Sequence, residues 1–124
     1  MELIRKTVPY KETNMRAEEL MNFQNTVVPK VGDKCTMHLW SDSHACQVTR
    51  VSKSGKTVWI QRNITTVDPS KENGMGHQNW VLHENEFEGC EMRITKRKDG
   101  KWRESRSDTP VVFGQWHEYY DWEF

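Results

Sequence analysis

The segment Trp40–His44 holds the residue types of a hydrolytic triad within a few positions. Ser41, Asp42 and His44 would supply the nucleophile, the orienting acid and the base. Triad members normally come from distant chain segments, and side chains this close in one turn cannot easily line up for proton transfer. Asp42 and Ser43 are more typical of residues that bond backbone amides to hold a turn. We therefore predict no catalytic residue here and expect a protein that is not an enzyme.

Cysteine and histidine, the ligands that zinc prefers, recur around the same segment at Cys35, His38, His44 and Cys46. On a regular strand, residues three positions apart point to opposite faces, which separates Cys35 from His38. Structural zinc sites also usually draw their ligands from two tight turns, and these four residues flank only one predicted turn. Buried, reduced thiols are the simpler interpretation. We predict neither a metal site nor a cofactor.

Aromatic and cationic side chains point to another kind of chemistry, the binding of a nucleotide. The chain has six Trp, and Trp40 and Trp80 fall in a turn and a loop, where an indole face can stack a base. Packing at the edge of the core is the alternative for both. Arg62 and Arg97 would contact phosphate, because guanidinium groups match phosphate oxygens bidentately. The polar edges of such a ligand would be contacted by Asp42, His44 and Gln78.

The elements that must position these groups follow a period of two. In Lys34–Arg62 the pattern indicates three strands joined by two tight turns, the second of them at Ser54-Gly55. The same alternating pattern over Glu91–Arg106 predicts another hairpin, which turns at Asp99-Gly100. Val111–Phe113 reads as a last strand. Between the hairpins we predict a long irregular connection over 63–89, with a short strand at Trp80–Leu82.

These elements predict a mainly β fold, a small bent antiparallel barrel or SH3-like roll of five or six strands. With 124 residues the chain is long enough for one core. We place an N-terminal arm with a short helix at 1–30 and a single β-rich domain at 31–124. Thr13 or Asn14 would cap that helix. Trp59 and Trp102 lie mid-strand and are the expected core tryptophans.

Charge and hydropathy exclude some functions and leave others open. The net charge is +0 and the mean hydropathy is -0.92, so bulk attraction to nucleic acid or an anionic membrane is not indicated. No apolar run approaches the length of a membrane span. Weak charge repulsion favours self-association, and we expect a homo-oligomer. A basic face on the second hairpin is either ordinary solvated surface or a nucleic-acid contact, and consists of Arg93, Lys96, Arg97, Lys101, Arg103 and Arg106.

Several short stretches together resemble a family of small proteins encoded by bacteriophages. They are VGDKCTMHLWSDSHA at 31–45, GKTVWIQRN at 55–63, NGM at 73–75, RKDGKWRE at 97–104 and EYYDWEF at 118–124. The resemblance covers about residues 31–124. The chain departs from the family pattern at Ser43, where Arg is usual, and at Asn63, where Asp is usual. The matching positions are Trp40, Ser41, Asp42, His44 and Ala45, then Asn73, Gly74, Met75 and Gln78, then Tyr119, Tyr120 and Asp121.

The resemblance implies a small accessory protein of the host cytoplasm that acts in anti-defence, or immune evasion. Such proteins block a defence protein or act as a sponge for a nucleotide second messenger. We therefore expect a non-enzymatic phage protein that binds and sequesters a nucleotide-derived host immune signal. Ser41, Met75, Tyr119 and Tyr120 join the expected ligand-binding residues on this basis. The alternatives are an inhibitor or adaptor that binds a host defence protein through the aromatic tail and a sheet edge, or nucleic-acid binding through the basic hairpin.

Overall fold

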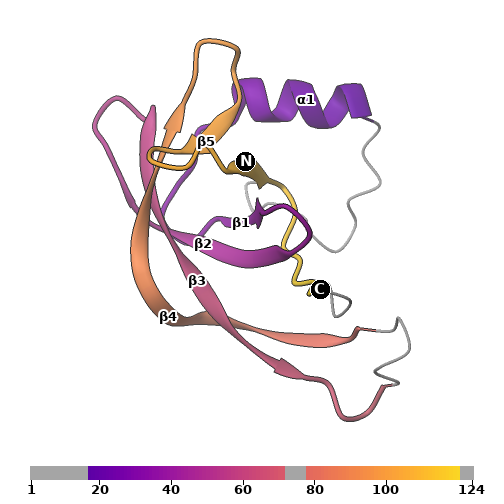
Figure 1. Cartoon of the computed structure of the whole chain (residues 1–124). Coiled ribbons are helices and arrows are strands. Elements are labelled where there is room, and N and C mark those ends of the chain that lie inside the picture. The colour runs from indigo at the N-terminus through magenta and orange to yellow at the C-terminus, as the bar shows by residue number, and fades with distance from the viewer. Residues whose placement is uncertain (1–16, 72–77, 121–124) are drawn as a thin grey trace, which may run out of the picture.

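The structure is a computed structural model that describes residues 17–71 and 78–120 of the chain. It is a β-barrel with one short helix at its rim (Figure 1). The elements in chain order are α1 (Ala17–Thr26), β1 (Lys34–His38), β2 (Ser43–Val51), β3 (Thr57–Val67), β4 (Trp80–Lys96), β5 (Trp102–Glu104) and β6 (Pro110–Phe113).

The strands are antiparallel and follow one another around the barrel in sequence order. β6 closes the ring by pairing with β1, where Cys35 lies opposite Phe113 and Met37 lies opposite Val111. Short turns suffice for such a meander, because each strand pairs with its neighbour in the chain. The expected mainly β, antiparallel barrel with a short helix is therefore confirmed, and its strand number is six.

The barrel interior is filled by side chains that alternate along the strands. Val58 and Ile60 of β3 point inward, and the intervening Trp59 lies half-buried on the outer wall, with the Arg50 guanidinium 4.1 Å from its ring. The prediction that Trp59 is a core residue was therefore wrong. Trp102, the other tryptophan predicted for the core, is buried and packs edge-on against Phe113, with the ring centroids 5.3 Å apart.

The β3–β4 hairpin is longer than the sequence indicated. β3 continues to Val67 and β4 begins at Trp80, so the prediction of an irregular connection was wrong for residues 63–67 and 83–89, which lie in strands. Pairing continues past two register shifts, at Ile60/Arg62 and at Asn63/Thr65. Asn85 and Gly89 have positive φ angles of 63° and 76°, which favour such irregular backbone. The hairpin extends below the barrel as a curved two-stranded ribbon (Figure 1).

Helix α1 is fixed to the barrel by hydrogen bonds as well as by apolar contact. The Gln24 side chain donates from Nε2 to the Phe113 carbonyl at 2.6 Å, and its Oε1 accepts from the Phe113 amide at 2.8 Å. Trp102 Nε1 donates to the Gln24 carbonyl at 3.1 Å. Phe23 packs against the core. The predicted caps, Thr13 and Asn14, lie outside the described residues. None of the described residues forms a helix with the length and apolarity needed to cross a membrane.

After β6, residues 114–120 (the tail) cross the barrel toward the start of β2. Trp116 is buried, and its Nε1 donates to Asn63 Oδ1 at 3.0 Å. Asn63 Nδ2 in turn donates to Gln47 Oε1 at 2.8 Å, and the Asn85 amide donates to the same oxygen at 2.7 Å. Buried polar groups cost stability unless they are paired, and this amide network pairs them across β2, β3, β4 and the tail.

Candidate functional site

A buried carboxylate, Glu118, lies where the tail meets the barrel. Its Oε1 accepts the Ala45 amide at 2.9 Å, and its Oε2 lies 3.2 Å from His44 Nδ1 and 2.8 Å from Arg62 Nη2. The Tyr120 hydroxyl also bonds to it. The side chain has no solvent exposure. A charge in such a position is tolerated only when several donors surround it.

The surrounding donors decide the protonation state of this carboxylate. Burial acts to raise the pKa of Glu118, but the hydrogen bonds from His44, the Ala45 amide and Arg62 outweigh it and lower the pKa below its ordinary value of 4.5. Glu118 is therefore ionised at neutral pH. The Arg62 guanidinium also contacts the Tyr120 hydroxyl and lies 3.6 Å from Glu88. The acid and base groups of the cluster are thus bonded to one another, as in a structural network.

The end of the tail is held between β2 and the start of β4. Tyr119 and Ser43 exchange backbone hydrogen bonds, each of 2.9 Å. The Gln78 side-chain amide donates to the Tyr120 carbonyl, and its oxygen accepts the Tyr120 amide at 2.8 Å. The ring of Trp80 packs edge-on against Tyr120, with the centroids 5.2 Å apart. This part of the site is therefore built by the tail joining segments that are distant in sequence.

A pocket of about 240 Å³ lies beside this junction, and we call it the tail pocket. Its walls come from the segments that flank residues 72–77 and from the tail. Its lining includes the aromatic Trp80, the amide residues Gln78 and Asn79, and Lys71. The Gln78 side-chain amide already bonds to the Tyr120 backbone and accepts from Trp80 Nε1 at 3.1 Å. The complete lining is Asp68, Lys71, Gln78, Asn79, Trp80, Leu82, Trp116, His117 and Glu118. Aromatic, amide and cationic groups thus line one hollow together with the acids Asp68 and Glu118.

The structure brings together five of the residues expected to bind a ligand. His44, Arg62, Gln78, Trp80 and Tyr120 form one group around Glu118 and the tail.

Other residues expected to bind a ligand lie apart from that group. Trp40 is 95% exposed at the tip of the β1–β2 turn, and Ser41 and Asp42 are part-buried beside it. Tyr119 is 41% exposed, and its ring lies nearly parallel to that of His117, with the centroids 6.5 Å apart. Arg97 pairs with Asp108 at 2.7 Å and lines a hollow that includes Asn25 of α1. Met75 lies outside the described residues.

Sequence reasoning missed Glu118, which organises the cluster. The available signal was the position of this acid between aromatic residues, Trp116 on one side and Tyr119 and Tyr120 on the other. Aromatic residues are often buried, and a buried acid requires donors. Sequence reasoning also missed three residues that line the tail pocket, because the path of the tail across the barrel decides which residues lie around the pocket. They are Lys71, Asn79 and Trp116.

The two cysteines that were considered as zinc ligands lie in the barrel wall. Cys35 and Cys46 are buried, free and directly opposed across β1 and β2. Burial, followed by the charge of Glu118, raises the pKa of Cys46 to about 12, and burial raises that of Cys35. Both thiols are therefore protonated at neutral pH. Within residues 17–71 and 78–120, no group of three or more His, Cys, Asp or Glu side chains is arranged to hold a metal ion.

Comparisons of the chain with protein-family models, with curated proteins and with solved structures found no match. The functional interpretation therefore rests on the geometry of the site and on the sequence resemblance described above.

Proposed function

We propose that the protein is a non-enzymatic phage accessory protein that binds and sequesters a nucleotide-derived host immune signal. The tail pocket is the proposed site for the base of that ligand. The observation that carries the proposal is the position of Trp80, which lines a hollow together with Asn79 and Lys71. Base stacking, amide hydrogen bonds and a cation for phosphate are the three contacts that a nucleotide needs.

The size of the tail pocket limits what it would enclose. Pockets that surround a whole drug-sized ligand usually measure about 300–1,000 Å³, and this pocket measures about 240 Å³. It suits one ring system, with sugar and phosphate directed outward. Lys71 would meet the phosphate, because it is the lysine that lines the tail pocket, whereas Arg62 and Arg97 do not line it.

Binding without turnover is supported by the chemistry of the Glu118 cluster. A general acid or base must be able to reach a proton on the substrate. Glu118 has no solvent exposure, and the groups around it bond to it and to each other. Their hydrogen bonds fix the tail against the barrel and so fix one wall of the tail pocket.

Isothermal titration calorimetry with cyclic nucleotides and ADP-ribose derivatives tests this proposal. We expect one of them to bind the native protein and Trp80→Ala to bind it more weakly by about 1–3 kcal/mol, the usual effect of losing one stacked base. Trp80→Phe, which keeps a ring, would retain most of the affinity. Trp59→Phe is the matched control, because Trp59 lies on the outer wall under Arg50. Equal affinity in Trp80→Ala and native protein would contradict the proposal.

An exposed apolar patch favours a second function, the binding of a protein. Leu39, Trp40 and Tyr119 are 42%, 95% and 41% exposed and lie together at the β1–β2 turn, where Tyr119 pairs with Ser43. Exposed tryptophan and tyrosine are typical centres of protein interfaces. A host defence protein or a second copy of the chain would meet this patch. The expected homo-oligomer is proposed on the same ground.

Trp40→Ser tests this second function, because Trp40 makes little contact with the barrel. Its loss should leave the thermal unfolding midpoint unchanged but abolish capture of a protein partner or shift the oligomer to monomer by light scattering. Val31→Ser is the control, since Val31 is 66% exposed and precedes β1 at the end away from the β1–β2 turn. Unchanged partner capture and an unchanged mass in Trp40→Ser would rule out the patch as an interface.

A further inference from the structure

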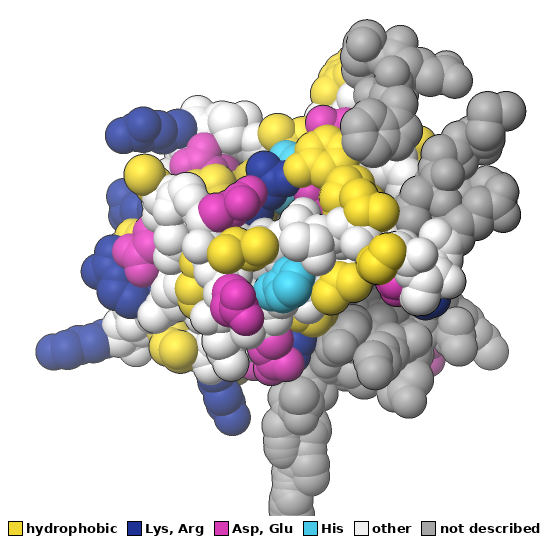
Figure 2. All heavy atoms as spheres, turned by 90° about the horizontal axis from the view of Figure 1, so that it is seen from below, with side chains coloured by type: hydrophobic (Ala, Val, Ile, Leu, Met, Phe, Trp, Pro, Cys, Tyr) yellow, Lys and Arg dark blue, Asp and Glu magenta, His cyan; other side chains and the backbone are white. Residues whose placement is uncertain are grey.

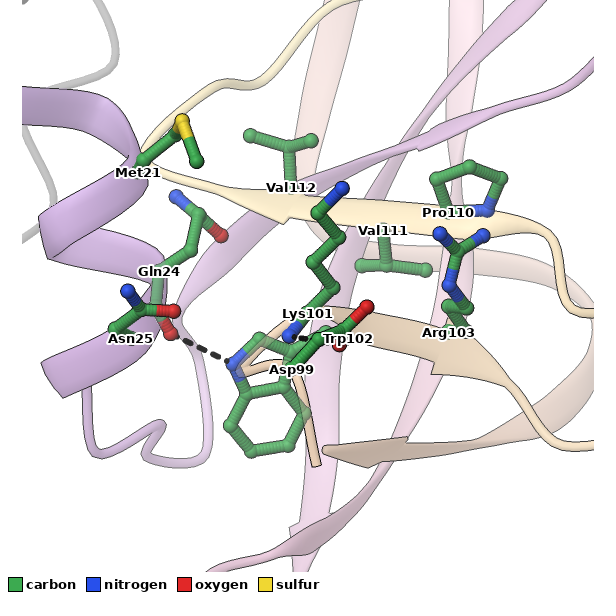
Figure 3. Close-up of a pocket in the computed structure, with 10 residues that line it drawn as sticks. All are labelled: Met21, Gln24, Asn25, Asp99, Lys101, Trp102, Arg103, Pro110, Val111 and Val112. Atoms are coloured by element: carbon green, nitrogen blue, oxygen red, sulfur yellow. Dashed lines mark hydrogen bonds between the residues drawn. The ribbon is translucent and has the colours of Figure 1, made fainter. Parts of the chain in front are cut away.

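A second pocket lies at the other end of the barrel, between α1 and strands β5 and β6. It measures about 200 Å³, and we call it the helix pocket (Figure 3). Its wall is formed mainly by Met21 of α1, the buried Trp102 and Val111, and the outward-facing Pro110 and Val112. This surface is apolar. No residue of the helix pocket lines the tail pocket, so it does not belong to the site proposed above.

The helix pocket is held open by the way in which α1 docks. The Gln24 amide pairs with both backbone groups of Phe113, and Trp102 Nε1 donates to the Gln24 carbonyl. The Asn25 side chain occupies the space that a Cβ on Gly100 would take, which brings the β4–β5 turn against the helix. These contacts satisfy the polar groups around the hollow and fix the distance between helix and sheet. The inner surface of the helix pocket therefore offers few hydrogen-bond donors or acceptors to a ligand.

Positive charge lies at the mouth of this apolar hollow. In Figure 3 the side chain of Lys101 extends across the space between α1 and β6, and the Arg103 guanidinium lies over Pro110. Asp99, the acid at the mouth, accepts the Lys101 backbone amide at 2.9 Å and so is engaged in the turn. A neighbouring hollow shares Asn25 and Asp99 with the helix pocket and adds Lys56, Lys96, Arg97 and Lys98.

We propose that the helix pocket binds a small amphipathic anion, an apolar chain or ring that ends in a carboxylate. The apolar part fills the space between Met21, Trp102 and Val112, and the carboxylate meets the Lys101 ammonium at the mouth. Since a water molecule takes about 30 Å³ of liquid volume, the pocket has the volume of about seven waters. That volume suits a chain of about six to eight carbons.

NMR with octanoate tests this proposal on the full-length protein. The indole N–H signal of Trp102, assigned by its loss in Trp102→Phe, reports on the pocket because this group bonds to Gln24. We expect octanoate to shift the signal in a saturable way and octylammonium, with the same chain and the opposite charge, to bind at least tenfold more weakly. Equal binding of the two ligands, or a signal that octanoate does not move, would overturn the proposal.

Two variants separate the charge from the apolar wall. Lys101→Met should weaken octanoate binding about three- to fivefold, as expected for one exposed ion pair, and Lys53→Met in the β2–β3 turn should leave it unchanged. Val112→Phe should fill the hollow and remove binding of both ligands. Unchanged affinity in Lys101→Met would overturn the proposal even if Val112→Phe does not fold. A signal that responds to protein concentration but not to octanoate would assign this face to a second copy of the chain.

Discussion

At the scale of single residues, the ionised Glu118 is the group on which the site depends most. It is the fully buried carboxylate that joins the tail to β2 through His44 and the Ala45 amide, and to β3 through Arg62. Residue types near Trp40–His44 suggested chemistry within one turn. The structure instead uses His44 as a partner for an acid 74 positions later in the chain. Sequence spacing could not indicate this pair, because only the closed barrel and the crossing tail bring the two side chains together.

Replacing Glu118 with Gln should lower the free energy of unfolding by about 3 kcal/mol. Breaking a buried ion pair usually costs about 3–5 kcal/mol. We expect the low end of that range, because the Arg62 side chain is 26% exposed. Urea unfolding at pH 7 measures the loss. Glu91→Gln is the control, since its pair with Arg50 lies on the surface and should contribute less than about 1 kcal/mol.

The stability of the native protein should also decrease in acid because of Glu118. Its pKa is lower in the folded state than its ordinary value of 4.5, so its contribution is complete above that value. The contribution is lost as the pH falls through the lower, folded pKa. Urea midpoints measured between pH 7 and pH 3 should therefore decline in the native protein more steeply than in Glu118→Gln. Parallel pH profiles would contradict the assignment of this carboxylate as ionised and bonded.

The three cysteines should differ in reactivity according to their burial. Cys90 is exposed, whereas Cys35 and Cys46 are buried, and burial raises the pKa of both buried thiols. A thiolate is the reactive form, so an aromatic disulfide reagent at pH 8 should titrate one thiol in the native protein and three in denaturant. Rapid reaction of more than one thiol in the native protein would show that the β1–β2 packing is wrong.

At the scale of elements, two glutamine side chains pair with backbone N–H and C=O groups, as a neighbouring strand usually does. Gln24 pairs with both backbone groups of Phe113, and Gln78 does the same with Tyr120. The chain from the end of β6 to the end of the described tail is therefore held at each end by a side-chain amide. Backbone groups there would otherwise lack partners, and unpaired buried groups are costly.

Replacing Gln24 with Glu should release the helix from the barrel. A carboxylate can accept the Phe113 amide but cannot donate to the Phe113 carbonyl, and the loss of one such bond costs about 1–3 kcal/mol. Thermal unfolding measures the effect. Asn22→Asp, an equivalent change on the exposed side of α1, should be close to neutral. Equal midpoints for the two variants would mean that the Gln24 bonds contribute little.

The strands and the fold class were predictable because apolar residues alternate and the turns carry Gly. Alternation also indicates the inward positions of Val58, Ile60, Met92 and Ile94. The extension of β3 and β4 was not predictable from that pattern. Residues 80–91 include several acids, and the positive φ angles at Asn85 and Gly89 interrupt the alternation. The tail crossing and the two glutamine contacts depend on tertiary packing and left no local signal.

At the scale of the whole molecule, the two proposed sites lie at opposite ends of the barrel and differ in character. The helix pocket has lysine and arginine at its mouth, whereas the β3–β4 hairpin carries the exposed acids Glu84, Glu86 and Glu88. Figure 2 shows apolar and acidic side chains gathered over the underside, with Lys and Arg mostly at one side of that view. The net charge of +0 therefore conceals a separation of charge. This separation favours the anion proposed for the helix pocket, whereas the phosphate of a nucleotide in the tail pocket would depend on its contact with Lys71.

The proposed function requires that the tail pocket bind a nucleotide. The most direct measurement is to incubate the purified protein with extract of infected bacterial cells, remove unbound material and analyse by mass spectrometry what heating releases. We expect a nucleotide or nucleotide derivative from the native protein and from Trp59→Phe, and much less of it from Trp80→Ala. Release of no nucleotide from the native protein, together with no thermal shift from cyclic nucleotides or ADP-ribose derivatives, would contradict the proposed function.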